Sequence, residues 1–253
     1  MFRLAPLIGQ DFPIFLLNPR QVSNAAGQVT IEDMARLFVP QLLAAQPTGQ
    51  FRIGGFCFGS VLAWEIANQL VKAGRKVEFI VLIDGPSLNG RITLRVAKRV
   101  LNLIARISPN KIRKKIRIDG MRVIWNYART TGVRDRLNVW RVMRRLFFDF
   151  IGRRPLSAVS DITIEGDPLS MDRYRSLSNY LPPSIDTELF YLVCDENAMR
   201  MDYSPVAWTN LSRVVHFKGI PGGHITCIFT FAGELANELR QIFSARPSDL
   251  VKS

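Results

Sequence analysis

The feature that most constrains the fold is a glycine-rich turn between a short apolar run and a helical pattern. Residues 51–56 (FRIGGF) have the length and composition of a buried strand, and residues 59–73 have a helical pattern that stops at Gly74. The turn that joins them is Gly55-Phe56-Cys57-Phe58-Gly59. A strand that leads directly into a helix is a building unit of parallel α/β sheets. The segment therefore predicts an α/β protein.

The flanking sequence repeats this alternation. A helix is predicted after Thr30, a plausible N-cap with Asp33 three residues later. A closing amphipathic helix is predicted for residues 232–243. Further buried strands are predicted for residues 13–17, 77–83, 188–193 and 214–220. The order of strands and helices predicts a mostly parallel sheet with helices on both faces.

A basic segment interrupts this alternation. The chain has 34 basic and 21 acidic residues, a net charge of +13, and residues 91–154 hold 19 of the basic residues but only three acids. Apolar residues recur there at helical spacing between the basic ones, first at Ile92, Val96, Val100, Leu103, Ile104 and Ile107. We expect amphipathic helices with basic outer faces, inserted into a nearly neutral core. The predicted divisions are a core segment 1–88, a helical insertion 89–168 and a second core segment 169–253.

Cys57 is the candidate nucleophile. The pattern G-x-C-x-G is the G-x-S-x-G nucleophile elbow with cysteine in place of serine. Gly55 and Gly59 are expected to leave room for a sharp turn. The start of the following helix favours a thiolate, and the Phe58 N–H is expected to be one oxyanion-hole donor.

An acid and a histidine follow in the chain order typical of α/β-hydrolases. Asp84 ends the strand VLIDGPS, and His224 lies in the glycine-rich segment IPGGHITCI. Asp195 and Glu196, which follow the strand at 188–193, are alternatives for the acid that orients the histidine. The other histidine, His216, lies within a predicted strand and is expected to be structural. Cys194 and Cys227 are expected to be buried, without a catalytic role.

These segments resemble the thioesterase domains of nonribosomal peptide and polyketide synthases, members of the α/β-hydrolase superfamily. The resemblance rests on FRIGGFCFGSVLAWEIANQL, AAQPTGQ, VLIDGPS and IPGGHITCI, and on FRLAPLIGQDFPIFLL before TIEDMA. It implies a Cys57–His224–Asp84 triad and a helical lid at the position of the basic insertion. It also implies an acyl chain delivered on the phosphopantetheine arm of a carrier protein or upstream synthase module. Release would occur by hydrolysis or cyclisation, with no cofactor of the enzyme's own and no metal.

The sequence departs from this family in two respects. Serine is the usual nucleophile, and we hypothesise that Cys57 serves a demanding release such as lactone, lactam or amide formation. The family also begins with a strand and a glycine-rich loop that supplies a second oxyanion-hole donor. That strand would lie between the predicted strand 13–17 and the strand 51–56, and it is absent from the sequence. We therefore expect a truncated start and an unfilled gap in the sheet.

The basic insertion suggests what binds there. The densest cluster comprises Lys111, Arg113, Lys114, Lys115 and Arg117, and we expect it to dock an acidic carrier protein. Contact with anionic lipid is an alternative role for basic amphipathic helices. The confinement of the charge to one insertion argues against nucleic acid as a partner. The aromatic residues Trp125, Tyr127 and Trp140 could line an acyl pocket or belong to the core.

Two other functions compete with the thioesterase. The segment GFCFG also resembles the elbow of dienelactone hydrolases, which use Cys, Asp and His. The basic segment alone would suit a non-catalytic protein that binds a carrier or a membrane. The sequence has no signal-peptide pattern and no apolar run of about 20 residues, and its three cysteines cannot all pair. These features predict a cytoplasmic protein.

Overall fold

The structure is a computed structural model of the chain. It describes residues 4–9, 11–17, 30–87, 92–107, 176–177, 179–199 and 203–244. The helices are α1 (Leu4–Ile8), α2 (Ile31–Ala45), α3 (Phe58–Lys72), α4 (Ile92–Ile107), the 3₁₀ helix η5 (Pro205–Ala207), α8 (Thr226–Phe229) and α9 (Ala232–Ser244). The strands are β1 (Phe51–Phe56), β2 (Val77–Ile83), β3 (Glu188–Cys194) and β4 (Val214–Ile220). Four of the five predicted strands are therefore confirmed.

The four strands form one parallel sheet in the order β1-β2-β3-β4. In the register of the sheet, Phe56 pairs with Ile83 at the carboxyl ends of β1 and β2. Cys194 pairs with Ile220 at the carboxyl ends of β3 and β4. The predicted candidates Cys57, Asp84 and Asp195 each directly follow a strand, so they share one edge of the sheet.

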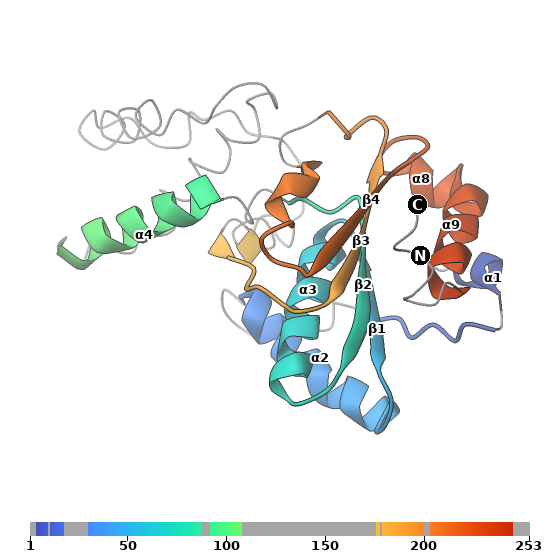
Figure 1. The fold of residues 1–253 in the computed structure, drawn as a ribbon, viewed down its shortest axis with the longest axis horizontal. Helices are drawn as coiled ribbons and strands as arrows, with labels where there is room; N and C mark the ends of the chain where they lie inside the picture. The colour runs from blue at the N-terminus through green and yellow to red at the C-terminus, as the bar shows by residue number, and fades with distance from the viewer. Residues whose placement is uncertain are drawn as a thin grey trace, which may run out of the picture.

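Helices cover both faces of the sheet (Figure 1). One hydrophobic cluster joins the sheet to α2 and α3, through residues such as Phe38, Trp64 and Ile80. A second cluster joins the opposite face to α1, α8 and α9, through residues such as Val81 and Leu239. The two layers are visible in Figure 1, with α2 and α3 on one side of the strands and α1, α8 and α9 on the other. This is the doubly covered parallel sheet that the sequence predicts.

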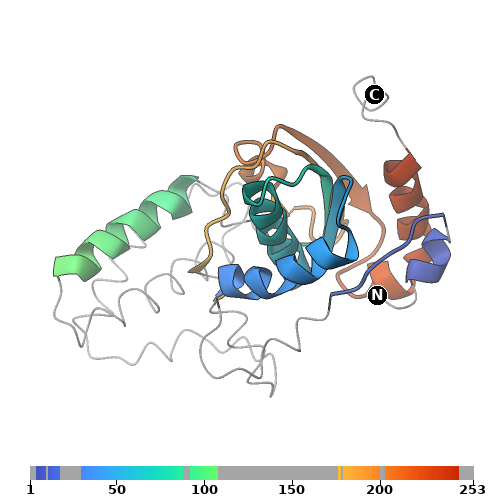
Figure 2. The same ribbon diagram turned by 90° about the horizontal axis from the view of Figure 1, so that it is seen from below.

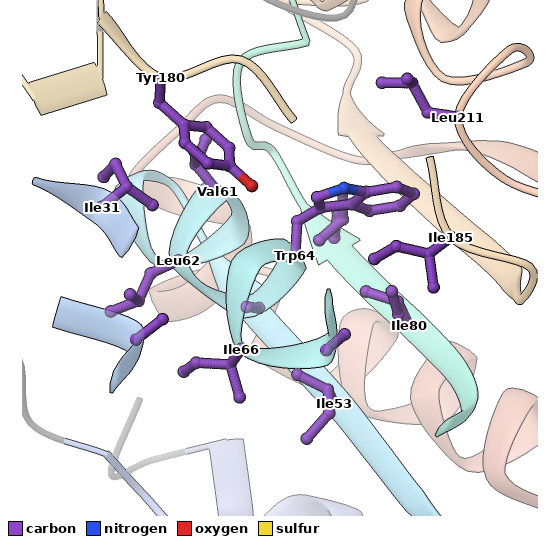
Figure 3. Close-up of a cluster of buried hydrophobic side chains, with 14 of the residues drawn as sticks. Ile31, Ile53, Val61, Leu62, Trp64, Ile66, Ile80, Tyr180, Ile185 and Leu211 are labelled. Atoms are coloured by element: carbon purple, nitrogen blue, oxygen red, sulfur yellow. The ribbon is translucent and has the colours of Figure 1, made fainter. Parts of the chain in front are cut away.

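Helix α3 packs at the centre of the larger cluster. Its side chains lie among residues of α2, β1, β2 and the segment before β3 (Figure 3). Trp64 is fully buried, and its indole N–H donates to the carbonyl oxygen of Pro183 at 2.9 Å. Its ring lies 4.7 Å from the ring of Trp208. The elbow helix is thus fixed to segments that follow the insertion.

The helix predicted after Thr30 is α2, and it begins at Ile31, directly after the predicted cap. Thr30 has extended backbone angles, and its hydroxyl accepts a hydrogen bond from the Asp33 backbone N–H at 3.1 Å. The Thr30 hydroxyl also donates to the Asp33 carboxylate at 2.8 Å. These contacts satisfy a helix N-terminal N–H that the helix itself cannot satisfy.

The prediction of a strand at residues 13–17 is wrong. This segment has no strand pairing, and among the described strands β1 is paired on one side alone, with β2. A cavity of about 790 Å³ is lined by both the segment and β1. Among the described residues, this cavity thus lies beside β1, and an irregular segment borders it. Residues 13–17 line this cavity, although Ile14, Phe15 and Leu16 remain exposed.

The first predicted helix of the insertion is present as α4, which extends away from the sheet (Figures 1 and 2). Of its larger apolar residues, Val96, Leu103 and Ile107 are exposed. The residues buried on α4 are Ala97, Leu101 and Ala105. The rest of the insertion, which contains the basic cluster at 111–117 and residues 125, 127 and 140, lies outside the described residues. No helix among the described residues has the length and apolarity needed to cross a membrane.

Candidate active site

Cys57 occupies a strained turn between β1 and α3. Its backbone angles are φ +57° and ψ −125°, in a region that residues other than glycine rarely adopt. The Cys57 N–H donates to the carbonyl oxygen of Ile83 at 3.0 Å, which ties the turn to the end of β2. The residue is half-buried and its thiol is free. This is the sharp strand-to-helix turn that G-x-C-x-G predicts.

The two glycines of the motif differ in whether the surrounding backbone leaves room for a side chain. A Cβ atom at Gly55 would lie 2.0 Å from the carbonyl oxygen of Gly59 and 2.7 Å from the Ser60 nitrogen. A Cβ atom at Gly59 would meet no atom of the described residues within 4 Å beyond its local backbone. The prediction that both glycines prevent a clash is therefore right for Gly55 and wrong for Gly59.

Ser60 supports the turn from inside the fold. Its hydroxyl is fully buried and lies 2.7 Å from the Gly55 carbonyl oxygen and 3.2 Å from that of Ile83. It therefore links the end of β1 to the end of β2 below the nucleophile. This role was not predicted from the sequence, although a serine in the first turn of a buried helix is a detectable signal.

The structure brings Asp84 and His224 together from opposite halves of the chain. His224 Nδ1 lies 2.5 Å from Asp84 Oδ2. Asp84 is fully buried and has a positive φ of 44°. Its carboxylate also accepts hydrogen bonds from the Cys194 N–H at 3.0 Å and from the Asn197 side-chain amide at 2.8 Å. Asn197 was not singled out in the sequence, but it is a polar residue just past the carboxyl end of a strand.

These contacts set the charge of Asp84. Burial opposes its ionisation, but the hydrogen bonds from His224, the Cys194 N–H and Asn197 outweigh burial and hold the Asp84 pKa below its usual 3.8. A buried carboxylate is thus held ionised by its hydrogen-bond donors. Its negative charge faces the imidazole.

His224 contacts both other members of the predicted triad. The hydrogen bond to Asp84 and then the hydrogen bond to Cys57 raise the pKa of His224 to about 10, and burial only partly offsets them. The Phe56 ring stacks on the imidazole at 4.8 Å between ring centres. The loop that holds His224 is closed by a hydrogen bond from the Gly223 N–H to the Thr226 hydroxyl at 2.7 Å. The imidazole is therefore held between an acid and a thiol.

The other sequence candidates lie elsewhere. The Asp195 side chain is exposed and packs against Gly219, while Glu196 lies against the backbone of Gly223. His216 lies in β4 and stacks on Phe190, 4.6 Å away. Phe58 is the first residue of α3, directly after the nucleophile. No cluster of three or more potential metal ligands is found among the residues that the structure describes.

The two remaining cysteines are buried as predicted, and both contact the histidine loop. The Cys194 thiol donates to the carbonyl oxygen of Gly223 at 3.4 Å. The Cys227 thiol donates to that of His224 at 3.4 Å. They are therefore part of the packing that positions His224.

Comparison with known proteins places this geometry in a family. The sequence pattern described as "Thioesterase domain" matches residues 14–100, which include the elbow and Asp84. This part of the chain is similar to the thioesterase domain family. Its fold agrees: the structure aligns with that of the NocB thioesterase domain with a TM-score of 0.52, at 20% identity, over 91% of this chain and 82% of the other.

The related sequences include fungal synthases. The chain is 46% identical over 79 residues to a non-reducing polyketide synthase of Alternaria cinerariae, and 44% identical over 79 residues to one of Aspergillus terreus. Each match covers 31% of this chain but 4% of the synthase. The thioesterase match is thus a small part of much longer relatives.

Proposed function

We propose that the chain is a thioesterase that releases an acyl chain from a phosphopantetheine arm through a covalent thioester on Cys57. The observation that supports this most strongly is the 2.5 Å contact between His224 Nδ1 and the buried Asp84 carboxylate, at the same edge of the sheet as Cys57. The Asp84 carboxylate contacts Nδ1 of His224, which leaves Nε2 of His224 to exchange a proton with the Cys57 thiol. A nucleophile, a base and an acid that orients the base are the parts that acyl transfer needs.

The reaction takes place in two steps. In the first, the Cys57 thiolate attacks the thioester carbonyl, and the pantetheine thiol leaves with the proton that His224 carries. In the second, His224 removes a proton from water, or from a hydroxyl or amine of the substrate, which attacks the new thioester and expels Cys57 sulfur. Asp84 stabilises the imidazolium that donates its proton in the first step and forms again in the second. The Phe58 N–H, next to the nucleophile at the start of α3, is one proposed donor to the oxyanion.

The related sequences suggest the origin of the acyl group. The matching relatives are polyketide synthases, so we propose that a polyketide chain reaches Cys57 from a carrier protein or an upstream synthase module. Cys57 forms a thioester where serine would form an oxoester. Because a thiolate leaves more readily, the acyl-enzyme is better suited to attack by a hindered hydroxyl or an amine.

The test measures turnover of an acyl N-acetylcysteamine thioester. The rate is monitored through the free thiol that the reaction releases. We expect turnover by the wild-type chain and loss of at least about 10³-fold in Cys57→Ala and His224→Ala, as in other triads. Asp195→Asn, which removes an exposed carboxylate on the same edge of the sheet, is the matched control and should keep its activity. Equal activity of Cys57→Ala and the wild type would exclude this function.

Carrier docking is a separate part of the proposal and rests on the sequence. Lys111, Arg113, Lys114, Lys115 and Arg117 form the densest positive cluster, and carrier proteins are typically acidic. Reversal of several of these charges should raise the apparent KM for an acyl carrier protein and weaken its salt dependence, while the KM for an acyl N-acetylcysteamine thioester stays unchanged. An unchanged response to salt would contradict docking at this cluster.

A further inference from the structure

Asp84 lies in a strained turn directly after β2. Its φ of +44° is a left-handed value that residues other than glycine rarely adopt. The Asp84 N–H donates to the carbonyl oxygen of Leu192 in β3 at 2.7 Å, so the start of the turn still follows the sheet. The chain then leaves the sheet through Gly85 and Pro86, and Pro86 has no N–H to donate. The conformation of Asp84 therefore depends on what holds Gly85.

The Tyr191 hydroxyl holds the Gly85 carbonyl group. Tyr191 lies in β3 and is fully buried, and its hydroxyl donates to the Gly85 carbonyl oxygen at 2.7 Å. Its ring is fixed by other neighbours, because it lies 6.1 Å from the ring of Trp208 and 6.0 Å from the ring of Phe217. The hydroxyl thus contacts the acid turn while the ring packs elsewhere. The two contributions can be separated by removing the hydroxyl alone.

Burial fixes the protonation of this hydroxyl. It raises the pKa of Tyr191 well above its usual 10, and the negative charge of Asp84 acts in the same direction. The hydroxyl therefore keeps its proton near neutral pH. It serves as a hydrogen-bond donor to the turn and not as a second base.

Gly85 connects the acid turn to the nucleophile turn. A Cβ atom at Gly85 would lie 2.2 Å from the Ser60 Cβ and 3.3 Å from the Cys57 carbonyl oxygen, so the two turns pack directly against each other. Ser60 is the buried residue that links β1 to β2 beneath the nucleophile. A shift of Gly85 would therefore move Asp84 and also loosen the packing below Cys57.

We infer that Tyr191 is a positioning residue of the proposed thioesterase: by holding Gly85, its hydroxyl keeps the Asp84 carboxylate against the imidazole. Without the hydroxyl, the buried Gly85 carbonyl loses a donor, and the turn can relax from its left-handed conformation. The inference rests on the proposed function for its effect on rate. The contact between Asp84 and His224 exists without turnover, so it can be tested separately.

Tyr191→Phe tests this role because it removes the hydroxyl and keeps the ring. The matched control is Tyr180→Phe. Tyr180 is also buried, and its hydroxyl donates at 2.8 Å to the carboxylate of Glu65, which lies in α3 and not at the acid turn. Each variant loses one buried hydrogen bond, so a purely structural effect would appear in both.

NMR titration of His224 gives a readout that needs no turnover. The chain has two histidines, so His216 serves as an internal reference. We expect the pKa of His224 to fall below about 10 in Tyr191→Phe, because the Asp84 carboxylate is held less closely, and to stay unchanged in Tyr180→Phe. In an Asp84→Asn background, Tyr191→Phe should change the His224 pKa no further, since the hydroxyl acts through the carboxylate.

Turnover of an acyl N-acetylcysteamine thioester gives the second readout. We expect kcat of Tyr191→Phe to fall roughly tenfold with KM unchanged, less than the roughly 10²-fold that a misplacement of about 1 Å can cost. Tyr180→Phe should keep its kcat. If the wild type shows no turnover, the proposed function fails, but the NMR comparison still decides whether Tyr191 positions the acid.

Two results would overturn the inference. The first is a His224 pKa in Tyr191→Phe that equals that of the wild type, or that shifts no more than in Tyr180→Phe. A loss of stability in urea shared by both tyrosine variants would then show that Tyr191 has a packing role alone. The second is a shift that persists in full in the Asp84→Asn background, because the hydroxyl would then act by a route other than the carboxylate.

Discussion

The Nδ1 atom of His224 lies 2.5 Å from Oδ2 of Asp84, although 140 residues separate the two in sequence. The contact forms because Asp84 directly follows β2 and His224 follows β4, and both strands end at the same edge of the parallel sheet. Cys57, which follows β1, completes the group. A single edge of the sheet thus holds a thiol, an imidazole and a buried carboxylate.

Asp84→Asn should abolish most of the activity without unfolding the site. The amide carries no charge to stabilise the imidazolium, so we expect turnover to fall by roughly 10³–10⁴-fold. The pKa of His224, measured by NMR, should fall from about 10 toward its ordinary 6.5. An unchanged His224 pKa would show that Asp84 does not set its charge.

Asn197→Ala should produce a smaller effect of the same kind. Asn197 donates to Asp84 Oδ2 at 2.8 Å and positions the carboxylate without reaching the nucleophile. We expect kcat to fall roughly tenfold, with KM unchanged and the pKa of Asp84 raised. If stability falls while kcat and the pH profile stay unchanged, Asn197 has a structural role alone.

Gly55→Ala and Gly59→Ala should differ sharply, although both glycines belong to the same motif. The first places a Cβ 2.0 Å from a backbone oxygen, whereas the second meets open space. We expect Gly55→Ala to lower the free energy of unfolding by several kcal/mol, about 3 or more, and to disrupt the elbow. Gly59→Ala should change it by less than about 1 kcal/mol. Urea unfolding compares the two, and equal losses would contradict the geometry.

The stability of the fold should depend on the protonation of His224. Its pKa is raised in the folded state, so its contribution to stability is complete below about 6.5 and is lost as pH rises through about 10. The difference in unfolding free energy between the wild type and His224→Gln should therefore shrink from pH 6.5 to pH 10. Other groups titrate in both proteins and cancel. A difference that does not change with pH would contradict the raised pKa.

Cys57→Ser tests why the nucleophile is cysteine. The serine variant would form an oxoester, which a hindered hydroxyl or an amine attacks less readily. We expect slower release and a larger share of hydrolysed product when a substrate with an internal nucleophile is supplied. Liquid chromatography with mass spectrometry separates cyclic from hydrolysed products. A serine variant that matches the wild type in product and rate would disprove the hypothesis.

The sequence predicts the sheet well because its signals are local. The strands β1, β2, β3 and β4 are short apolar runs next to turns, and the Thr30 cap marks the start of α2 by its own hydrogen bonds. The juxtaposition of Asp84 and His224 also follows from the rule that parallel strands end at one edge. These features need no knowledge of distant contacts.

The features that the sequence misses depend on tertiary neighbours. Residues 13–17 have the composition of a strand, but pairing requires a neighbouring edge, and the segment lies across a cavity from β1. The periodicity of α4 marks Val96 and Leu103 as apolar, but the packed face contains Ala97 and Leu101. Likewise, Asn197 and Ser60 acquire their roles only through groups brought near by the fold.

Mass spectrometry of the acylated protein, first intact and then after digestion, tests the central claim most directly. The chain is mixed with an acyl-phosphopantetheine thioester, quenched in acid within seconds and digested. We predict one added acyl mass, located on the peptide that contains Cys57 and absent from Cys57→Ala. His224→Ala should accumulate it far more slowly than the wild type. An acyl group on another residue, or the same adduct in Cys57→Ala, would contradict the account.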